Sequence, residues 1–359
     1  MKIEFLVIRP YEIDHFENVL IELVSRGIDT KIALHEEIDN SENFKILKRR
    51  NLPFSYRRNL DACVAITMYD QTYLYDYKNI KLKFKYGINP SKKTANLCSY
   101  YINGFDGILV HGRYEKDAIA KQNVIPENRI RIMGYPKNDK FFLNKKSSIE
   151  IREKYKINPP DNKKIIVYLP TWGEKSSIDI FYESLKELSP EYYIVTKPHH
   201  NNFYFLEKIN RWGKLMEISN VVVDVHASFP EIVSLADIII ADAKGGAFTE
   251  SAMINPKAHL IGLHPVRETT ENHYCPGVYD ICTFVQDPKK LQSAISKTYG
   301  NKQFYKSRIL FACKTFSYIG QNCSKIAATH ILELAKMQKI SLKPKFLRQL
   351  KCYIKKVLQ

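Results

Sequence analysis

The segment from Ala236 to Glu250 has the residue pattern of an anion-binding turn. Branched apolar residues at 238–241 predict a buried strand, and the glycines that follow Asp242 let a ligand approach the backbone before a helix begins. The N–H groups at a helix start favour negative charge. We therefore expect this loop to bind a diphosphate, through Asp242, Lys244, Gly245, Gly246, Thr249 and Glu250. A plain strand–turn–helix connection has the same pattern, so the segment alone leaves both interpretations open.

Two further apolar runs end in groups that suit a phosphate. Thr171 and Trp172 follow the first run, and Lys197, His199 and His200 follow the second. An ammonium and an imidazole would neutralise a diphosphate leaving group, so Lys197 and His199 are candidate catalytic residues. Thr171, Trp172 and His200 are candidate donor-binding residues. A packed tryptophan in a proline-containing loop and a solvated loop with incidental histidines are the structural alternatives.

The elements that must position these groups alternate between strand and helix. Residues 2–8 and 30–34 predict strands around a helix at 16–25, which is a βαβ opening. Further strands are predicted at 61–68, 107–110, 129–133, 165–168, 192–196, 221–225, 238–241 and 258–262, with helices at 114–120, 181–188, 229–235 and 248–253. This alternation predicts an α/β protein with two doubly wound parallel sheets, whose ligands bind at the carboxyl ends of the strands. His111 stands at such an end in the first half, where it would contact a ligand or form a surface turn.

A polar, lysine-rich stretch at 141–164 divides the chain. We expect a Rossmann-like acceptor-side domain at 1–145 and a Rossmann-like donor-binding domain at 146–335. The remaining residues, 336–359, predict a basic amphipathic helix, because apolar residues between Leu342 and Gln359 recur at helical spacing between cations. Such a helix would lie on an anionic membrane surface or pack back on the first domain.

Composition and absent motifs exclude several classes of protein. The 359 residues include 55 Lys and Arg against 38 Asp and Glu, an excess that suits an anionic partner. The seven cysteines form no C-x-x-C pair, as is typical of reduced thiols in the cytoplasm. The sequence has neither G-x-G-x-x-G after its first strand nor a P-loop, which argues against nicotinamide, flavin and nucleotide-hydrolysing enzymes. It has no D-x-D motif, no signal peptide and no membrane-spanning run, so we expect no metal and no cofactor.

The basic charge also permits a nucleic-acid-binding module. Tyr73, Tyr75 and Tyr77 stand near lysines and would stack on bases. No recognised nucleic-acid-binding motif accompanies them, and the strand-end motifs would go unexplained, so we expect no nucleic-acid partner.

The motifs follow one another in an order that resembles a known family. Tyr168–Trp172 reads Tyr-Leu-Pro-Thr-Trp, 197–200 reads Lys-Pro-His-His, Val225–Glu231 precedes the glycine loop, and Gly134–Asp139 reads Gly-Tyr-Pro-Lys-Asn-Asp. From about residue 80 to about residue 265 the chain resembles the CDP-glycerol glycerophosphotransferases of teichoic-acid and capsule synthesis. The resemblance implies a metal-independent GT-B enzyme with two Rossmann-like domains facing a cleft.

The sequence departs from that family at two places. The resemblance places the family's catalytic histidine at Tyr86, and a tyrosine is a poor general base at neutral pH. His15, Asp14 and His111 are alternatives for the base. The family's serine pair becomes Gly245 and Gly246, beside Lys244, which leaves the donor open.

The resemblance therefore implies transfer of a glycerol-phosphate, polyol-phosphate or sugar unit from a CDP-linked or other nucleotide donor to a lipid-linked or oligosaccharide acceptor. The enzyme would act in the cytoplasm, peripherally on the inner face of a bacterial cell membrane. A nucleotide-sugar glycosyltransferase or epimerase of the same fold, and a non-catalytic scaffold, are the alternatives.

Overall fold

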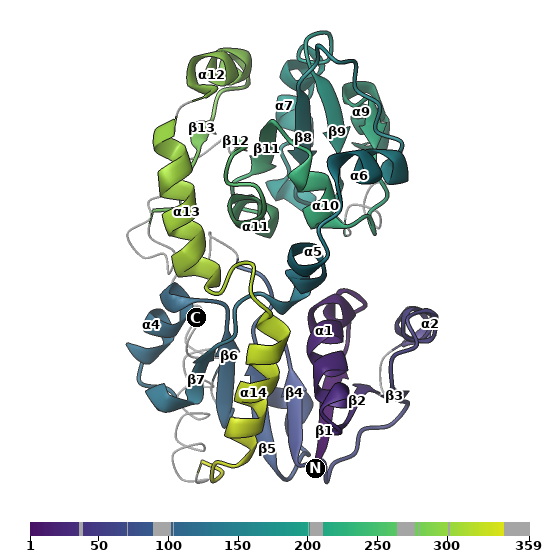
Figure 1. Ribbon diagram of the computed structural model, residues 1–359, viewed down its shortest axis with the longest axis vertical. Coiled ribbons are helices and arrows are strands. Elements are labelled where there is room, and N and C mark those ends of the chain that lie inside the picture. The colour runs from purple at the N-terminus through teal and green to yellow at the C-terminus, as the bar shows by residue number, and fades with distance from the viewer. Residues whose placement is uncertain are drawn as a thin grey trace. The chain divides into compact units, whose positions relative to one another are not determined.

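The computed structural model in Figure 1 describes residues 1–35, 39–69, 71–88, 102, 104–199, 201, 211–263, 277–278, 280–300 and 302–340. These residues form two compact units, each built on a parallel sheet. The first unit takes residues 1–87, the described residues up to Leu143, and residues 314–340; the second takes Ile88 and the described residues from Asn144 to Cys313. The predicted α/β fold with two doubly wound parallel sheets is confirmed.

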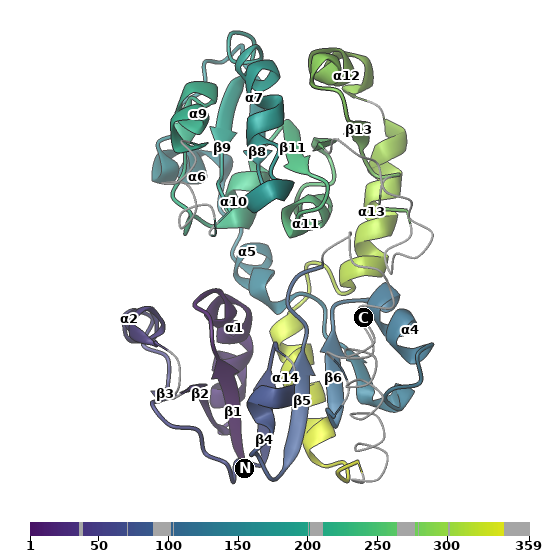
Figure 2. The same cartoon turned by 180° about the vertical axis from the view of Figure 1, so that it is seen from behind.

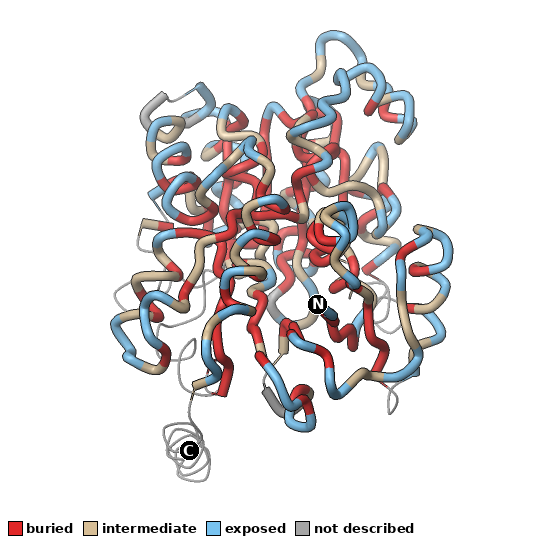
Figure 3. The backbone as a smooth tube through the Cα atoms, turned by 60° about the horizontal axis from the view of Figure 1, so that its bottom comes forward, coloured by how far each residue is buried: buried red, intermediate tan, exposed pale blue. Residues whose placement is uncertain are grey.

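The sheet of the first unit has seven parallel strands in the order β3-β2-β1-β4-β5-β6-β7. The strands are β1 (Lys2–Val7), β2 (Asp29–Leu34), β3 (Phe54–Ser55), β4 (Val64–Thr67), β5 (Ile80–Phe84), β6 (Gly107–Val110) and β7 (Ile130–Ile132). β4 and β6 are buried along their whole length, as covered parallel strands should be. Figure 3 shows buried stretches of backbone in red between exposed ones in pale blue.

The helices of the first unit are α1 (Tyr11–Ser25), α2 (Ser41–Arg49), α4 (Arg113–Ala120), α5 (Asp139–Leu143) and α14 (Cys323–Ala335), with 3-10 helices η1 (Gln71–Leu74), η2 (Glu127–Arg129) and η3 (Pro136–Asn138). Helices α1 and α14 lie against the same face of the sheet (Figure 1). Phe16 of α1 and Ile331 of α14 share one buried core with the strands.

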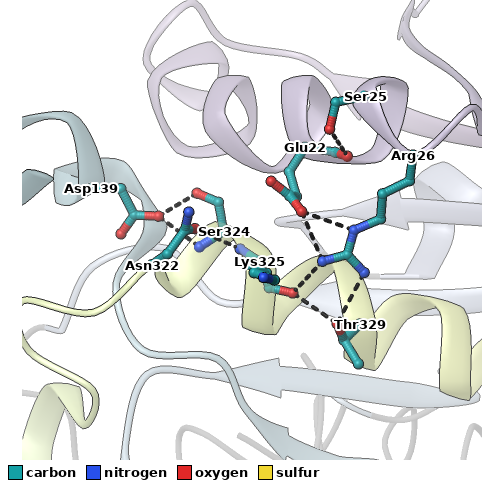
Figure 4. Close-up of polar contacts among 8 residues, drawn as sticks. All are labelled: Glu22, Ser25, Arg26, Asp139, Asn322, Ser324, Lys325 and Thr329. Atoms are coloured by element: carbon teal, nitrogen blue, oxygen red, sulfur yellow. Dashed lines mark hydrogen bonds and ion pairs between the residues drawn. The ribbon is translucent and has the colours of Figure 1, made fainter.

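The Gly134–Asp139 segment fastens α14 to this unit. The Asp139 carboxylate accepts hydrogen bonds from the backbone N–H groups of Cys323 (3.2 Å) and Ser324 (2.6 Å), at the start of the helix. Figure 4 shows the contact with Ser324. Asn322 caps the next exposed N–H, that of Lys325, at 2.8 Å. The side chain of one buried aspartate thus replaces the hydrogen bonds that a helix start lacks.

The return of the chain corrects the expected domain bounds. We expected the second domain to run to residue 335, but residues 314–335 pack with the first sheet. The apolar face of a helix predicts that this face is buried. The sequence pattern does not say which of the two sheets the helix packs against. The predicted helix at 342–359 lies outside the described residues. Among the described helices, none combines the length and the apolar character that crossing a membrane requires.

The sheet of the second unit has six parallel strands in the order β10-β9-β8-β11-β12-β13 (Figure 2). The strands are β8 (Ile165–Leu169), β9 (Tyr193–Thr196), β10 (Val221–Val222), β11 (Ile238–Asp242), β12 (His259–Leu263) and β13 (Thr283–Val285). The helices are α6 (Ser148–Tyr155), α7 (Ile178–Lys186), α9 (Arg211–Ile218), α10 (Phe229–Ser234), α11 (Gly246–Ile254), α12 (Leu291–Thr298) and α13 (Lys302–Phe316), whose last residues belong to the first unit, with 3-10 helices η4 (Gly173–Lys175) and η5 (Pro288–Lys290). Helices α7, α9 and α12 share a core with one face of the sheet.

Candidate active site

In the second unit, three loops meet at the carboxyl edge of three neighbouring strands. β8 lies between β9 and β11, so the loops after these strands are adjacent. They carry Thr171 and Trp172, Lys197 and His199, and the Asp242–Gly246 turn. The three segments that the sequence singled out are therefore brought together at one edge, the place where ligands bind in doubly wound sheets.

The Asp242 side chain holds the loop after β8 in place at this edge. Its side chain is buried, and Oδ2 accepts hydrogen bonds from the backbone N–H groups of Thr171 (2.6 Å) and Ser177 (3.2 Å). Burial raises the pKa of Asp242 to about 6, against the lowering effect of these hydrogen bonds. Oδ2 of Asp242 thus holds the loop after β8, while a donor contact of this residue stays a prediction.

The glycine turn lies directly beside Thr171. Gly245 is the N-cap of α11, and a Cβ on it would lie 3.2 Å from the Asp242 carbonyl oxygen and 3.6 Å from the Thr171 Cβ. Gly246 is the first residue of the helix, so its N–H is one of those without an intrahelical partner. Lys244 is partly exposed beside it. The turn therefore combines backbone donors, a cation and the Thr171 side chain, the groups that bind a phosphate.

The loops after β8 and β9 meet through an aromatic pair. The Trp172 ring is 41% exposed and lies 6.2 Å from the His199 ring. His199 accepts a hydrogen bond at Nδ1 from the Asn201 N–H (3.1 Å), and the Lys197 ammonium donates to the Val225 carbonyl at 2.9 Å. Lys197 is 9% exposed, so its charge lies within the edge and not at the tip of a mobile side chain. His200 lies outside the described residues.

Thr249 and Glu250, which we expected to bind the donor, have buried side chains. Thr249 is fully buried, and its hydroxyl donates to the carbonyl oxygens of Ile88 (3.0 Å) and Gly246 (2.9 Å). Glu250 is 8% exposed, and its Oε1 lies 4.0 Å from the position of a Cβ on Gly246. Thr249 is thus a structural residue because helical periodicity turns it toward the core, whereas Glu250 keeps a place near the helix start.

The first unit places the candidate bases at the carboxyl edge of its own sheet. Tyr86 follows β5 and is 36% exposed. His15 is buried on α1, with its ring 5.9 Å from the Tyr135 ring in an edge-on arrangement. Asp14 forms an ion pair with Arg50 at 2.7 Å, which engages the carboxylate that a base would need.

His111 forms a buried pair with Glu115, a residue that sequence reasoning did not single out. Its backbone N–H and its Nδ1 both lie 2.9 Å from Glu115 Oε2, and Lys85 Nζ lies 3.7 Å from Oε1. Burial alone would raise the pKa of Glu115, but His111 and Lys85 outweigh it and lower the pKa to about 2. The His111 side chain is fully buried in the structure, and a contact with a ligand stays a prediction.

A second buried carboxylate, Glu12, lies under the end of β1. Its Oε2 accepts the N–H groups of Ile8 (2.8 Å) and Arg9 (3.4 Å), and burial raises its pKa to about 7. The sequence indicates the contact between Ile8 and Glu12 only through their separation of four residues.

The three tyrosines considered for base stacking do not form one face. Tyr77 is 2% exposed and donates to Glu4, whereas Tyr75 is 74% exposed and Tyr73 is partly buried. Among the residues that the structure describes, His, Cys, Asp and Glu do not gather in threes at a possible metal site.

Residues 71–243 match the family model described as CDP-Glycerol:Poly(glycerophosphate) glycerophosphotransferase. This stretch belongs to the CDP-glycerol glycerophosphotransferase family. The match includes all three loops up to Ala243 and also Tyr86 and His111 of the first unit. The predicted family of transferases is confirmed.

Two curated relatives are teichoic acid poly(glycerol phosphate) polymerases. That of Bacillus spizizenii is 28% identical over 190 residues, which are 47% of this chain and 45% of the relative. That of Staphylococcus epidermidis is 25% identical over 170 residues, which are 43% of this chain and 22% of the relative. The matched stretch thus spans less than half the length of either polymerase.

Solved structures show the same fold at low sequence identity. The wall teichoic acid polymerase TagF has a TM-score of 0.61 and 17% identity, over 93% of this chain and 88% of that one. A UDP-GlcNAc 2-epimerase from Neisseria meningitidis has a TM-score of 0.62 and 15% identity, over 93% of this chain and 100% of that one. The GT-B fold that the family resemblance implied is confirmed.

Proposed function

We propose that the protein transfers a glycerol-phosphate or related polyol-phosphate unit from a nucleotide-activated donor, CDP-glycerol or a close analogue, to a glycan acceptor in teichoic-acid or capsule synthesis. The observation that carries this proposal is the convergence of Thr171, Lys197 and the Asp242–Gly246 turn at one edge of the second sheet, at the C-terminal end of the matched region 71–243. The family description and the two relatives support the choice of the transferred group.

In this reaction the protein forms no covalent bond with the substrates; it positions them and stabilises charge. An acceptor hydroxyl attacks the phosphorus that bears the glycerol, an O–P bond forms, and the bond to the nucleotide's bridging oxygen breaks. Negative charge moves to the departing nucleotide, where Lys197, His199 and the Gly246 N–H at the start of α11 stabilise it. No metal and no cofactor is part of this proposal.

The hydroxyl proton must pass to a base as the O–P bond forms. Tyr86, His15 and His111 stay the candidates on the acceptor side. In His111, the Glu115 carboxylate at Nδ1 favours the tautomer whose Nε2 carries the lone pair. His111 therefore has the orientation of a general base, although reaching a substrate would require its cover to open.

The charge distribution favours an anionic acceptor for the first unit. Residues 1–143 and 314–359 carry 33 Lys and Arg against 19 Asp and Glu, whereas residues 144–313 carry 22 against 19. Almost the whole basic excess thus belongs to the unit that does not carry the donor loops. We propose that the 342–359 segment adds to this attraction at an anionic bilayer. Unchanged partition of a chain truncated after residue 341 onto anionic vesicles would refute that role.

A nucleotide-release assay tests the proposed transfer. CDP-glycerol, UDP- and GDP-sugars are offered with membrane acceptors, and Lys197→Ala and His199→Ala are compared with the wild-type chain. Each variant should lose about 100-fold or more in turnover. Lys257→Ala is the matched control, because Lys257 is an exposed lysine of the same unit at the opposite end of the sheet, just before β12. Full turnover by either site variant would overturn the assignment.

A nucleotide-sugar epimerase is the second candidate, favoured by Gly245 and Gly246 in place of the family's serines. The equally high TM-score to the epimerase supports it only at the level of the fold. Release of free sugar from a UDP-sugar without any acceptor would favour this activity over transfer.

A further inference from the structure

Five ring side chains form a row at the carboxyl edge of the first sheet. The ring centroids of Tyr86 and Tyr11 are 6.2 Å apart, and the Tyr11 and Tyr69 hydroxyls are 2.9 Å apart. The row continues from Tyr69 to Tyr73 at 5.5 Å and from Tyr73 to His35 at 5.8 Å. These spacings are those of aromatic rings in direct contact.

The rings come from the ends of four neighbouring strands. His35 follows β2, Tyr11 lies in the turn after β1, Tyr69 follows β4, and Tyr86 follows β5. The two ends of the row, His35 and Tyr86, follow β2 and β5, which are three strand spacings apart in the sheet, about 14 Å. Between them the contacts cross from the end of β5 to that of β1 and back to that of β4. A row of that length is longer than one sugar ring.

Hydrogen bonds fix the middle of the row. Tyr69 and Tyr11 share a hydrogen bond, and the Glu12 carboxylate interacts with Tyr69 from below. Burial raises the pKa of Tyr11 to about 12, so its phenol stays protonated and able to donate at neutral pH. The rings therefore hold their orientation before any ligand arrives.

The row is not an ordinary part of the core. Tyr77 of the same segment is 2% exposed, whereas Tyr11, Tyr69 and Tyr73 are partly exposed and Tyr86 is 36% exposed; His35, at one end of the row, is buried. Rings that stay partly open at the carboxyl edge of a doubly wound sheet lie where such sheets bind ligands.

We propose that this aromatic row is an acceptor-binding track that packs against the sugar rings of a glycan. The inference rests on the proposed function for the meaning of "acceptor", and it adds the chemical class and the binding residues. Tyrosine offers an apolar face to the C–H groups of a sugar and a hydroxyl to its oxygens. An acceptor of two or more sugars would contact successive rings.

A sugar suits the row better than a bare polyol-phosphate chain. Lys83 of β5 is 3% exposed and donates to the carbonyl oxygens of Met68 (2.5 Å) and Tyr69. Its charge is thus directed at the backbone, while the row itself presents ring faces and phenols. Flat apolar faces recognise rings, and a flexible polyol chain presents none.

Direct binding and kinetics test the track with two synthetic acceptors. One is a disaccharide on an alkyl phosphate, and the other is an alkyl-linked tri(glycerol phosphate) without sugar. Tyr73→Ala and Tyr69→Ala should each raise the Kd and the KM of the disaccharide about three- to tenfold, the effect of one aromatic contact, with kcat unchanged. The sugar-free acceptor should change by less than about twofold.

Two matched variants separate recognition from damage to the fold. Tyr73→Phe keeps the ring face and should lose less affinity for the disaccharide than Tyr73→Ala. Tyr75→Ala removes an exposed tyrosine outside the row and should have no effect. Equal losses for both acceptors would mean a structural role, and greater loss for the sugar-free chain would mean a polyol-phosphate track; either result overturns the proposal, as does no loss at all.

The binding measurement also separates this proposal from the proposed function. Disaccharide binding by calorimetry needs no donor and no turnover. A chain that binds the disaccharide through Tyr73 but releases no nucleotide would keep the track and refute the transferase. If the chain turns over the donor but Tyr73→Ala binds the disaccharide as well as the wild-type chain does, the transferase is kept and the track is refuted.

Discussion

Replacing Gly134 by alanine should loosen α14 from the first unit. Gly134 has φ +74°, and a Cβ there would lie 2.4 Å from Cys323 Sγ, 3.2 Å from Cys323 Cβ and 3.3 Å from the Ser317 carbonyl oxygen. Gly27, in the same unit, also has φ +74° but has no atom within 4 Å of a Cβ. The two substitutions therefore share the backbone strain and differ in the clash.

The difference between the two variants isolates the clash. Alanine in the left-handed region costs about 1–2 kcal/mol, which both variants should lose. Gly134→Ala adds the cost of overpacking a filled site, about 1–3 kcal/mol. We expect Gly27→Ala to lower the free energy of unfolding by about 1–2 kcal/mol and Gly134→Ala by about 2–5 kcal/mol.

The position of the tryptophans makes the assay specific to one unit. The chain has two, Trp172 and Trp212, and both lie in the second unit. Urea unfolding followed by far-ultraviolet circular dichroism reports both units, and tryptophan fluorescence reports the second. Gly134→Ala should move the dichroism transition and raise hydrogen exchange in Cys323–Ala335, while the fluorescence transition stays in place.

A double-mutant cycle identifies the clashing atom. Cys323→Ala removes the Sγ that the new methyl group would meet. The loss of unfolding free energy in the Gly134→Ala, Cys323→Ala double variant should therefore be smaller than the sum of the losses in the two single variants. A cost for Gly134→Ala no larger than that for Gly27→Ala, or strictly additive losses in the cycle, would refute the packing argument.

Two pH dependences of opposite sign complete the predictions. Because burial raises the pKa of Asp242 from 3.8 to about 6, its contribution to stability is present below pH 4 and lost as the pH rises to 6, by about 3 kcal/mol; Asp242→Asn should flatten this change in fluorescence-detected urea titrations, and an unaltered pH profile would count against it. Hydrogen bonds from Lys146, Lys154 and Tyr155 overcome burial and lower the pKa of Glu231 to about 2. Its contribution is therefore present above pH 4.5 and lost as the pH falls toward 2, and Glu231→Gln should remove this part of the acid destabilisation, whereas a variant that still loses the same stability in acid would contradict the assignment.

Strand periodicity predicted most of the fold because parallel strands are apolar on both faces. The strand predicted at 107–110 coincides with β6, and those at 165–168 and 238–241 miss β8 and β11 by one residue. β5 was missed because Lys81 and Lys83 interrupt its apolar residues. Lys83 is buried on backbone carbonyls, a tertiary solution that a sequence pattern does not contain.

The candidate donor site was predicted at the level of loops and not of side chains. Strand ends located Thr171, Lys197 and Gly245 correctly at one edge, since parallel strands end together. They could not show that Asp242 turns inward to hold a neighbouring loop, or that Thr249 donates to Ile88. Both depend on contacts between segments more than 70 residues apart in sequence.

The first unit presents the same difficulty in stronger form, because no motif marks its site. Tyr11, Tyr69 and Tyr86 are separated by many residues and become neighbours only because β1, β4 and β5 are adjacent in the sheet. The family resemblance led us to expect a histidine at the position of Tyr86. In the structure, Tyr86 is one end of the row of rings. The substitution that argues against one catalytic role thus supplies part of the evidence for acceptor binding.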